Sequence, residues 1–132
     1  LSYFAFSAFQ LRPLDAAGGF FAGGALNPEN AKKGMAAMRE EIAKLVSGGI
    51  TPDELTGAKQ GLQQGFDRNL SNDPFVLNML QDGLYLDRKM EYWAKQNAAI
   101  AAATVDQVNA AIKRHLKPEA MITITAGDKK KM

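Results

Sequence analysis

The chain has 132 residues, 46% of them hydrophobic, which is enough for one domain with a core and predicts a single domain over residues 1–132. Sixteen Lys and Arg against fourteen Asp and Glu leave a net charge of +2, too small and too dispersed to indicate nucleic-acid or anionic-membrane binding. No apolar run approaches the roughly 20 residues that cross a bilayer, and the absence of cysteine excludes disulfides and thiolate metal sites.

Two strands are predicted at the start of the chain. Residues 2–11 place aromatic and small side chains on both sides of an extended segment, so we expect both of its faces to be at least partly covered. After a turn over residues 15–19, the apolar run Phe20–Leu26 predicts an antiparallel neighbour. Gly23 and Gly24 within that run indicate a bulge or a close approach of two backbones.

Two helices with apolar stripes follow the strands. The first opens at Asn27-Pro28 and the second at Pro52, and in each the apolar residues recur every three or four positions. We expect both stripes to pack on the sheet and on each other. The first stripe is Ala31, Met35, Met38, Ile42 and Leu45, and the second is Leu55, Ala58, Leu62, Phe66 and Leu70.

The connection between these helices carries strong local signals. Gly48 and Gly49 can adopt the left-handed conformation that closes a helix. Thr51 can cap the next helix, with Pro52 at its first position and Glu54 reaching back to the free amide of Thr51. A turn between two antiparallel helices is therefore predicted.

The remaining segments complete an α+β pattern. Asn72 or Asp73 with Pro74 starts a third helix, and residues 88–103 form a less regular helical stretch that Trp93 is expected to anchor. A capping box of Thr104 and Gln107 opens the last helix. Its buried side is predicted to comprise Val105, Val108, Ile112 and Leu116. Residues 121–125 alternate with period two and predict a closing strand, so we expect an antiparallel sheet with helices packed on one face.

The candidate chemical groups offer little on their own. His115 is the one histidine, and its place beside Lys113 and Arg114 is typical of a helix C-terminus. Asp53 and Glu54 serve a helix start, while the adjacent Glu40 and Glu41 are expected to point to different sides of a helix. We therefore predict no catalytic residue and no metal site in this chain.

Two further groups of residues have structural interpretations. Gly18, Gly19, Gly23 and Gly24 match no phosphate-binding loop, and residues 129–131 are expected to form a solvated basic tail. The Met and Phe stripes are predicted to be core, with a peptide groove as the lesser alternative.

Several short motifs, in order, resemble one family. The central motif is Gly49-Ile50-Thr51-Pro52-Asp53-Glu54-Leu55 with Ala58-Lys59 after it. The others are Leu1-Ser2-Tyr3, Gly19-Phe20-Phe21, Asn27-Pro28-Glu29-Asn30, Ala103-Thr104-Val105-Asp106-Gln107-Val108 and Ala126-Gly127-Asp128-Lys129-Lys130. Together they cover nearly the whole chain and resemble the C-terminal, non-catalytic half of the insulinase/pitrilysin-type zinc metallopeptidases, which include the mitochondrial processing peptidases.

The resemblance assigns a substrate-binding role to Tyr3. In that family the non-catalytic half supplies an arginine and a tyrosine, in a motif like Arg-Gly-Leu-x-Tyr, that hold the substrate backbone near the zinc. Leu1-Ser2-Tyr3 matches the end of this motif, so the arginine is expected to precede residue 1. A phenol can donate to a substrate carbonyl or to the oxyanion formed from it. The alternative from residue type alone is that Tyr3 packs within an aromatic strand.

The resemblance also implies a function and partners. The chain is expected to be the C-terminal lobe of a zinc-dependent endopeptidase, lining the proteolytic chamber and binding unfolded peptide. Zinc would sit on another domain or subunit, so the chain alone should not cleave. The alternatives are a catalytically inactive scaffold subunit of this family and an unrelated small binding module.

Truncation and compartment complete these expectations. With its N-terminal strands and upstream catalytic domain absent, the chain is expected to expose a sheet edge and apolar surface and to form a homodimer. The Gly-Asp-Lys-Lys ending resembles bacterial members, many of them exported, which favours the periplasm over the cytoplasm.

Overall fold

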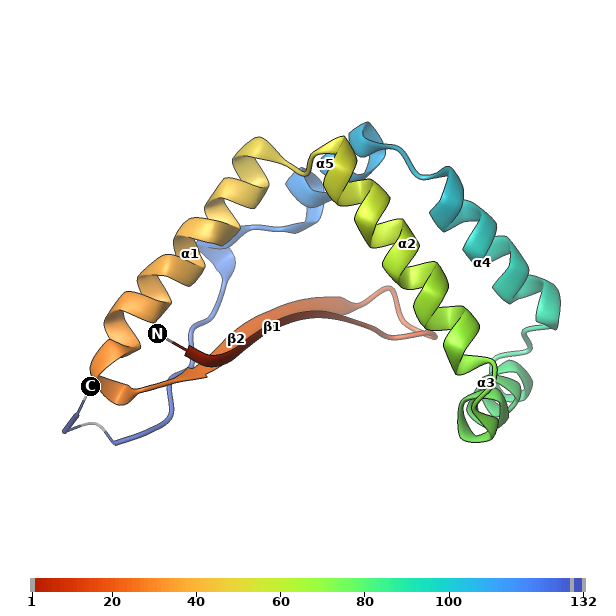
Figure 1. Cartoon of the computed structure of the whole chain (residues 1–132), viewed down its shortest axis with the longest axis horizontal. Coiled ribbons are helices and arrows are strands. Elements are labelled where there is room, and N and C mark those ends of the chain that lie inside the picture. Colours follow the sequence, from red (N-terminus) through yellow and green to blue (C-terminus); the bar gives the residue numbers. More distant parts are fainter. Residues whose placement is uncertain (1, 129, 132) are drawn as a thin grey trace. The chain divides into compact units, whose positions relative to one another are not determined.

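The computed structural model describes residues 2–128 and 130–131 and divides the chain into two compact units (Figure 1). The first unit comprises Leu1–Gly49 with Asn109–Met132, and the second comprises Ile50–Val108. Within the described residues there are five α-helices and one two-stranded antiparallel sheet. The predicted α+β class with an antiparallel sheet is therefore confirmed, whereas a single domain over the whole chain stays a prediction.

The first unit begins with a β-hairpin. Strand β1 (Ser2–Leu11) pairs antiparallel with β2 (Gly18–Leu26), and Phe9 lies opposite Phe20 in the register. The connecting loop is closed where the Arg12 amide donates to the Ala17 carbonyl at 3.1 Å. Both predicted strands are thus present, and they pair with each other as expected.

Two glycines of the first unit occupy positions of close approach. A Cβ atom on Gly24 would lie 2.7 Å from the Phe4 carbonyl oxygen, which confirms the predicted backbone approach. On the neighbouring helix, a Cβ atom on Gly34 would lie 2.8 Å from a methyl group of Leu26. Gly34 therefore lets the helix lie close to the end of β2.

Helix α1 (Ala31–Gly48) presents its predicted stripe to β2. It follows a 3-10 turn, η1 (Pro28–Asn30), in which the Asn27 side chain accepts a hydrogen bond from the Glu29 amide at 3.3 Å. Ala31 is buried, and the rest of the stripe is half-buried, comprising Met35, Met38, Ile42 and Leu45. Helix α1 contacts β2, so it covers part of the sheet.

The predicted helix stop and start are both present. Gly49 has φ +73°, and its amide donates to the Leu45 carbonyl at 2.9 Å. Helix α2 (Pro52–Asn69) opens with the predicted capping box. The Thr51 amide donates to Glu54 Oε2 at 2.7 Å, and the Glu54 amide donates to Thr51 Oγ1 at 3.2 Å. These bonds from Thr51 hold the pKa of the Glu54 carboxyl below its ordinary value.

The second unit packs α2 against the helices that follow it. Helix α3 (Asp73–Tyr85) is capped by the Asn72 side chain, and the rings of Phe66 and Phe75 meet edge to face with centroids 6.3 Å apart. Lys59 fastens α2 to the end of α4 (Met90–Ala102), since its ammonium donates to the carbonyls of Ala101 at 2.8 Å and Ala103 at 2.6 Å. Met79 of α3 is buried.

The expected anchor of α4 takes part in a chain of aromatic contacts. Trp93 is half-buried and meets the Tyr92 ring edge to face at 5.2 Å. The Arg88 guanidinium lies 4.3 Å from the centre of the Tyr92 ring. The guanidinium cation is attracted to the electron-rich face of the ring, and this contact stabilises the start of α4.

The last helix is α5 (Val105–His115), and it opens with the predicted capping box of Thr104 and Gln107. A 3-10 turn, η2 (Pro118–Ala120), follows, and Leu116 before it is buried. Of the predicted buried side, Leu116 is therefore buried, while Val105, Val108 and Ile112 are half-buried.

Two expectations about the sheet are wrong. Residues 121–125 form no strand, because within the described chain β1 and β2 have only each other as neighbours and no strand lies beside this segment. The faces of β1 are also not covered, since every side chain from Tyr3 to Leu11 is exposed. The expected contact between the stripes of α1 and α2 stays a prediction.

Candidate functional site

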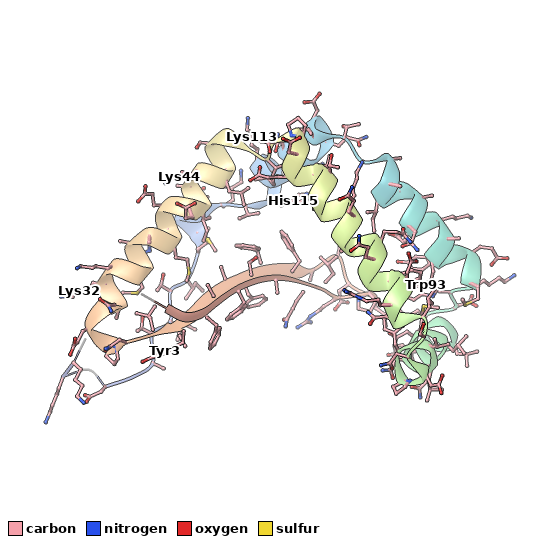
Figure 2. All side chains as sticks on the ribbon, viewed as in Figure 1. Tyr3, Lys32, Lys44, Trp93, Lys113 and His115 are labelled. Carbon is pink, nitrogen blue, oxygen red and sulfur yellow. The ribbon has the colours of Figure 1, made fainter. Side chains whose placement is uncertain are left out.

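Tyr3 lies at an irregularity in the β-hairpin. Ser2 is opposite Leu26 and Phe4 is opposite Ala25, so two steps along β1 match one step along β2, and Tyr3 is the extra residue of a bulge. Bulges bend a strand and redirect a side chain. The Tyr3 side chain is 81% exposed and projects from the end of the ribbon (Figure 2). Its phenol therefore faces solvent and does not take part in core packing.

The hairpin carries aromatic rings on both of its faces, which we call the aromatic ribbon: Tyr3, Phe4, Phe6, Phe9, Phe20 and Phe21. Phe4 and Phe6 are stacked with centroids 6.3 Å apart, and Phe9 meets Phe20 across the strands at 5.1 Å. The Phe6 ring lies over Gly23, where a Cβ atom would come within 2.9 Å of it. Rings supported in this way can take up apolar side chains of a peptide.

A cavity of about 800 Å³ adjoins the hairpin on the side of β2, and we call it the β2 slot. Its walls are residues 22–26 of β2 and residues 118–127 excluding 120, and its floor is α1. The α1 floor comprises Ala31, Gly34, Met35, Met38, Arg39, Ile42 and Ala43. The Arg39 guanidinium donates to Thr123 Oγ1 at 3.0 Å, which ties the C-terminal wall to the floor. The slot is large enough for a peptide-sized ligand.

The second unit contains a smaller cavity of about 580 Å³ along α2 and α4. Phe66, Phe75 and Ile100 give it an apolar lining. Lys59 also lines it, but its ammonium is held by the Ala101 and Ala103 carbonyls. This cation is therefore engaged in joining two helices.

Glu40 and Glu41 both reach one lysine. Lys44 lies 2.9 Å from Glu40 and 3.0 Å from Glu41, at the i+4 and i+3 positions. Adjacent residues of a helix point in different directions, and the long lysine side chain lies between these two. The hydrogen bond and positive charge of Lys44 lower the pKa of Glu40, and the two carboxylates raise the pKa of Lys44. All three groups lie in solvent, so this pairing is a surface feature.

The other candidates are on the surface. His115 ends α5 and is exposed, in a last turn that also holds Lys113 and Arg114. Lys130 and Lys131 of the basic tail are exposed as well, while Lys129 lies outside the described residues. Leu1, the first residue of the motif that ends in Tyr3, also lies outside them.

Neither a metal centre nor a membrane span is found in residues 2–128 and 130–131. There, no three His, Asp or Glu side chains gather in a group that could hold a metal ion. In the same part of the chain, no helix combines the length and apolar character needed to span a membrane.

Comparison of the chain with protein-family models, curated proteins and solved structures found no match. Membership of the insulinase/pitrilysin-type family therefore stays a prediction that rests on the motifs. Of the sites, Tyr3 was singled out from the sequence, whereas the β2 slot was not. The signal for the slot was present in the combination of the α1 stripe with the alternating residues 121–125.

Proposed function

We propose that this chain is the C-terminal, peptide-binding lobe of a zinc-dependent endopeptidase of the insulinase/pitrilysin type, with the zinc on another domain or subunit. The observation that carries the proposal is the place of Tyr3. It stands in a bulge at the end of the aromatic ribbon with its side chain 81% exposed. The reaction class, zinc-dependent peptide hydrolysis, is inferred from the order of the sequence motifs, which resembles that of the insulinase/pitrilysin family.

The chain's own groups would bind and orient the substrate. The Tyr3 hydroxyl can donate a hydrogen bond to a peptide carbonyl, and it can donate to the same oxygen as negative charge develops there. The rings of Phe4 and Phe6, which share one face of β1, would take up apolar side chains of an unfolded segment. Recognition of this kind depends on backbone and on apolar character, so it suits peptides of varied sequence.

A second candidate is a catalytically inactive scaffold subunit, and the exposed apolar side chains of the hairpin favour an assembly role. They are Tyr3, Phe4, Phe6, Phe9 and Leu11, all of which are exposed. Exposed apolar patches of this kind are typical of interaction surfaces. A partner surface that covers them is thus expected under either candidate.

The test compares Tyr3→Phe with the wild-type chain in zinc-dependent cleavage of an unstructured peptide. Each is combined with the His-x-x-Glu-His domain or subunit that the family resemblance implies. Removal of the hydroxyl is expected to lower kcat/KM about tenfold, or about 1.4 kcal/mol of transition-state stabilisation. The fold should be unchanged, because the side chain is exposed.

Tyr85→Phe is the matched control, since Tyr85 is also an exposed tyrosine, at 76%, but lies on α3. Its activity should equal that of the wild type. Equal activity of Tyr3→Phe and Tyr85→Phe would remove Tyr3 from the site. No cleavage by the wild-type pair would favour the scaffold.

A further inference from the structure

The β2 slot meets β2 along its edge. Five consecutive residues of β2, from Ala22 to Leu26, line the slot, and no residue of β1 does. Side chains alternate between the two faces of a strand, so a cavity lying on one face would be lined by every second residue. A consecutive lining on the side away from β1 places the slot at the edge where β2 has no strand neighbour among the described residues.

The opposite wall has the side-chain alternation of a strand although it is not one. Thr123 bonds to Arg39 of α1, and Thr125 Oγ1 lies 3.4 Å from the sulfur of Met35, also on α1. Ile122 and Ile124, which alternate with these two threonines, are each 89% exposed. Alternate side chains thus point toward and away from the helix, as in a β-strand over a helical layer. Residues 121–127 also line the slot consecutively, so this wall too presents its backbone.

The floor and the charges of the slot define what it can hold. Met35, Met38 and Ile42 line it and remain only half-buried. Arg39 and Glu119 are its two charged residues among those described, and they are of opposite sign. Arg39 is already bonded to Thr123. The slot is therefore neutral overall, with an apolar floor and polar backbone along both sides.

We propose that the β2 slot binds an extended, uncharged polypeptide strand from a partner protein, which pairs with β2 on one side and with residues 121–126 on the other. Backbone hydrogen bonds would supply the affinity, and apolar side chains on one face of the strand would cover the α1 floor. The strand would match the five residues of β2 that line the slot. This inference rests on the backbone of β2 and the stripe of α1, and it depends neither on Tyr3 nor on zinc.

A second copy of the chain is a poorer occupant than a partner strand. A strand in the slot needs both of its edges free. The β1 strand of another copy is uncharged but has one edge paired with its own β2. The free segment of another copy, residues 121–126, already forms the wall of its own slot. A partner segment that is free on both sides satisfies the geometry without breaking either arrangement.

The test uses the full 132-residue chain and an eight-residue synthetic peptide of alternating Val and Thr with one Lys at each end. Amide hydrogen exchange is followed by NMR with and without peptide at about 1 mM. Exchange of amides in residues 22–26 and 122–125 is expected to slow about tenfold, while exchange in α2 stays unchanged.

Two N-methylated forms of the peptide test the pairing. Methyl groups on alternate amides block one edge of a strand, and the two possible sets block opposite edges. Both forms should fail to slow exchange, because the proposal uses both edges. Slowing that survives either form would overturn it, as would no slowing with the unmodified peptide. Slowing that rises with protein concentration and needs no peptide would assign the slot to a second copy instead.

A pair of protein variants locates the site. Met38→Glu places a carboxylate on the floor of the slot, whereas Ala37→Glu places one on the exposed side of the same helix. Met38→Glu should weaken peptide binding about tenfold, and Ala37→Glu should leave it unchanged. Equal affinities in two folded variants would contradict the proposed location. If Met38→Glu does not fold, the N-methylated peptides still decide.

Discussion

Strand β2 and residues 121–126 make an instructive pair, because both are uncharged and strand-like in sequence but only one is a strand. β2 begins at Gly18, a short loop after β1 ends at Leu11, so a partner is supplied at little loop-closure cost. Residues 121–126 follow a helix and a 3-10 turn and have no local partner. Alternation in the sequence therefore indicates a capacity to pair, whereas a strand forms only where a neighbouring strand is available.

A substitution that disrupts the pairing of β1 with β2 is expected to have the greatest effect on stability. Gly24→Val would place a side chain against the Phe4 carbonyl oxygen, because even a Cβ atom there would lie only 2.7 Å away. Relief requires movement of the backbone, so the pairing of β1 with β2 should be destabilised by about 2 kcal/mol. The measurement is the free energy of opening of the hairpin amides by hydrogen exchange.

Gly61→Ala is the control for Gly24→Val. Gly61 is also a glycine inside a regular element, but nothing lies within 4 Å of the site of its Cβ atom. Alanine should therefore stabilise α2, by about 1 kcal/mol. The explanation fails if Gly24→Val leaves the opening free energy of the hairpin as it was.

The start of α2 depends on local contacts alone, since its capping hydrogen bonds join residues within a span of four. Thr51→Ala removes the hydroxyl that accepts from the Glu54 amide, and should lower the free energy of unfolding by about 1 kcal/mol. Urea denaturation monitored by circular dichroism measures the change. Thr56→Ala provides a matched comparison, because Thr56 lies inside the same helix and donates to the Pro52 carbonyl at 2.9 Å.

The pH dependence gives a second readout of this cap. The pKa of Glu54 is lowered in the folded chain by the bonds from Thr51, so its contribution to stability is present above the ordinary pKa. That contribution disappears as the pH falls through the lowered pKa. Thr51→Ala should weaken this acid dependence, whereas Thr56→Ala should retain it. Identical unfolding curves for both variants at every pH would contradict the capping role.

What could be predicted from the sequence follows the same division between local and non-local partners. The caps at Thr51 and Thr104 were predicted, and the start of the third helix was predicted at Asn72 or Asp73, because each capping bond joins residues three positions apart. The close approach at Gly24 was also predicted, since its neighbour belongs to the same hairpin. The bare faces of β1 and the unpaired residues 121–125 were missed, because both depend on what lies beside them in space.

The candidate site divides in the same way. Tyr3 could be singled out from a motif, but its bulge depends on the register with Leu26 and Ala25, which no local pattern fixes. The β2 slot required three separate segments to be placed together. The apolar stripe of α1 that forms its floor was predicted from the sequence, but that stripe was expected to be covered by the sheet.

The smallest effect is expected at the C-terminal segment. Replacing both Ile122 and Ile124 by Thr should change the free energy of unfolding by less than about 0.5 kcal/mol, because both side chains are 89% exposed. Ile112→Thr makes the same substitution at a half-buried position of α5 and should cost about 1 kcal/mol. Thermal unfolding of the three proteins is sufficient. A large loss on changing Ile122 and Ile124 would mean that the segment already has a packed neighbour.

The composition of the two strand-like regions bears on how the chain resists aggregation. Residues 2–9 and 121–126 contain neither charge nor proline, which is the composition from which cross-β fibrils grow. The residues that could stop such growth stand just outside them: Arg12 and Pro13 after the first, and Pro118 and Asp128 on either side of the second. Flanking residues of this kind limit fibril growth. Residues 3–9 and 122–126 are nevertheless exposed, so each region stays open to pairing with another strand.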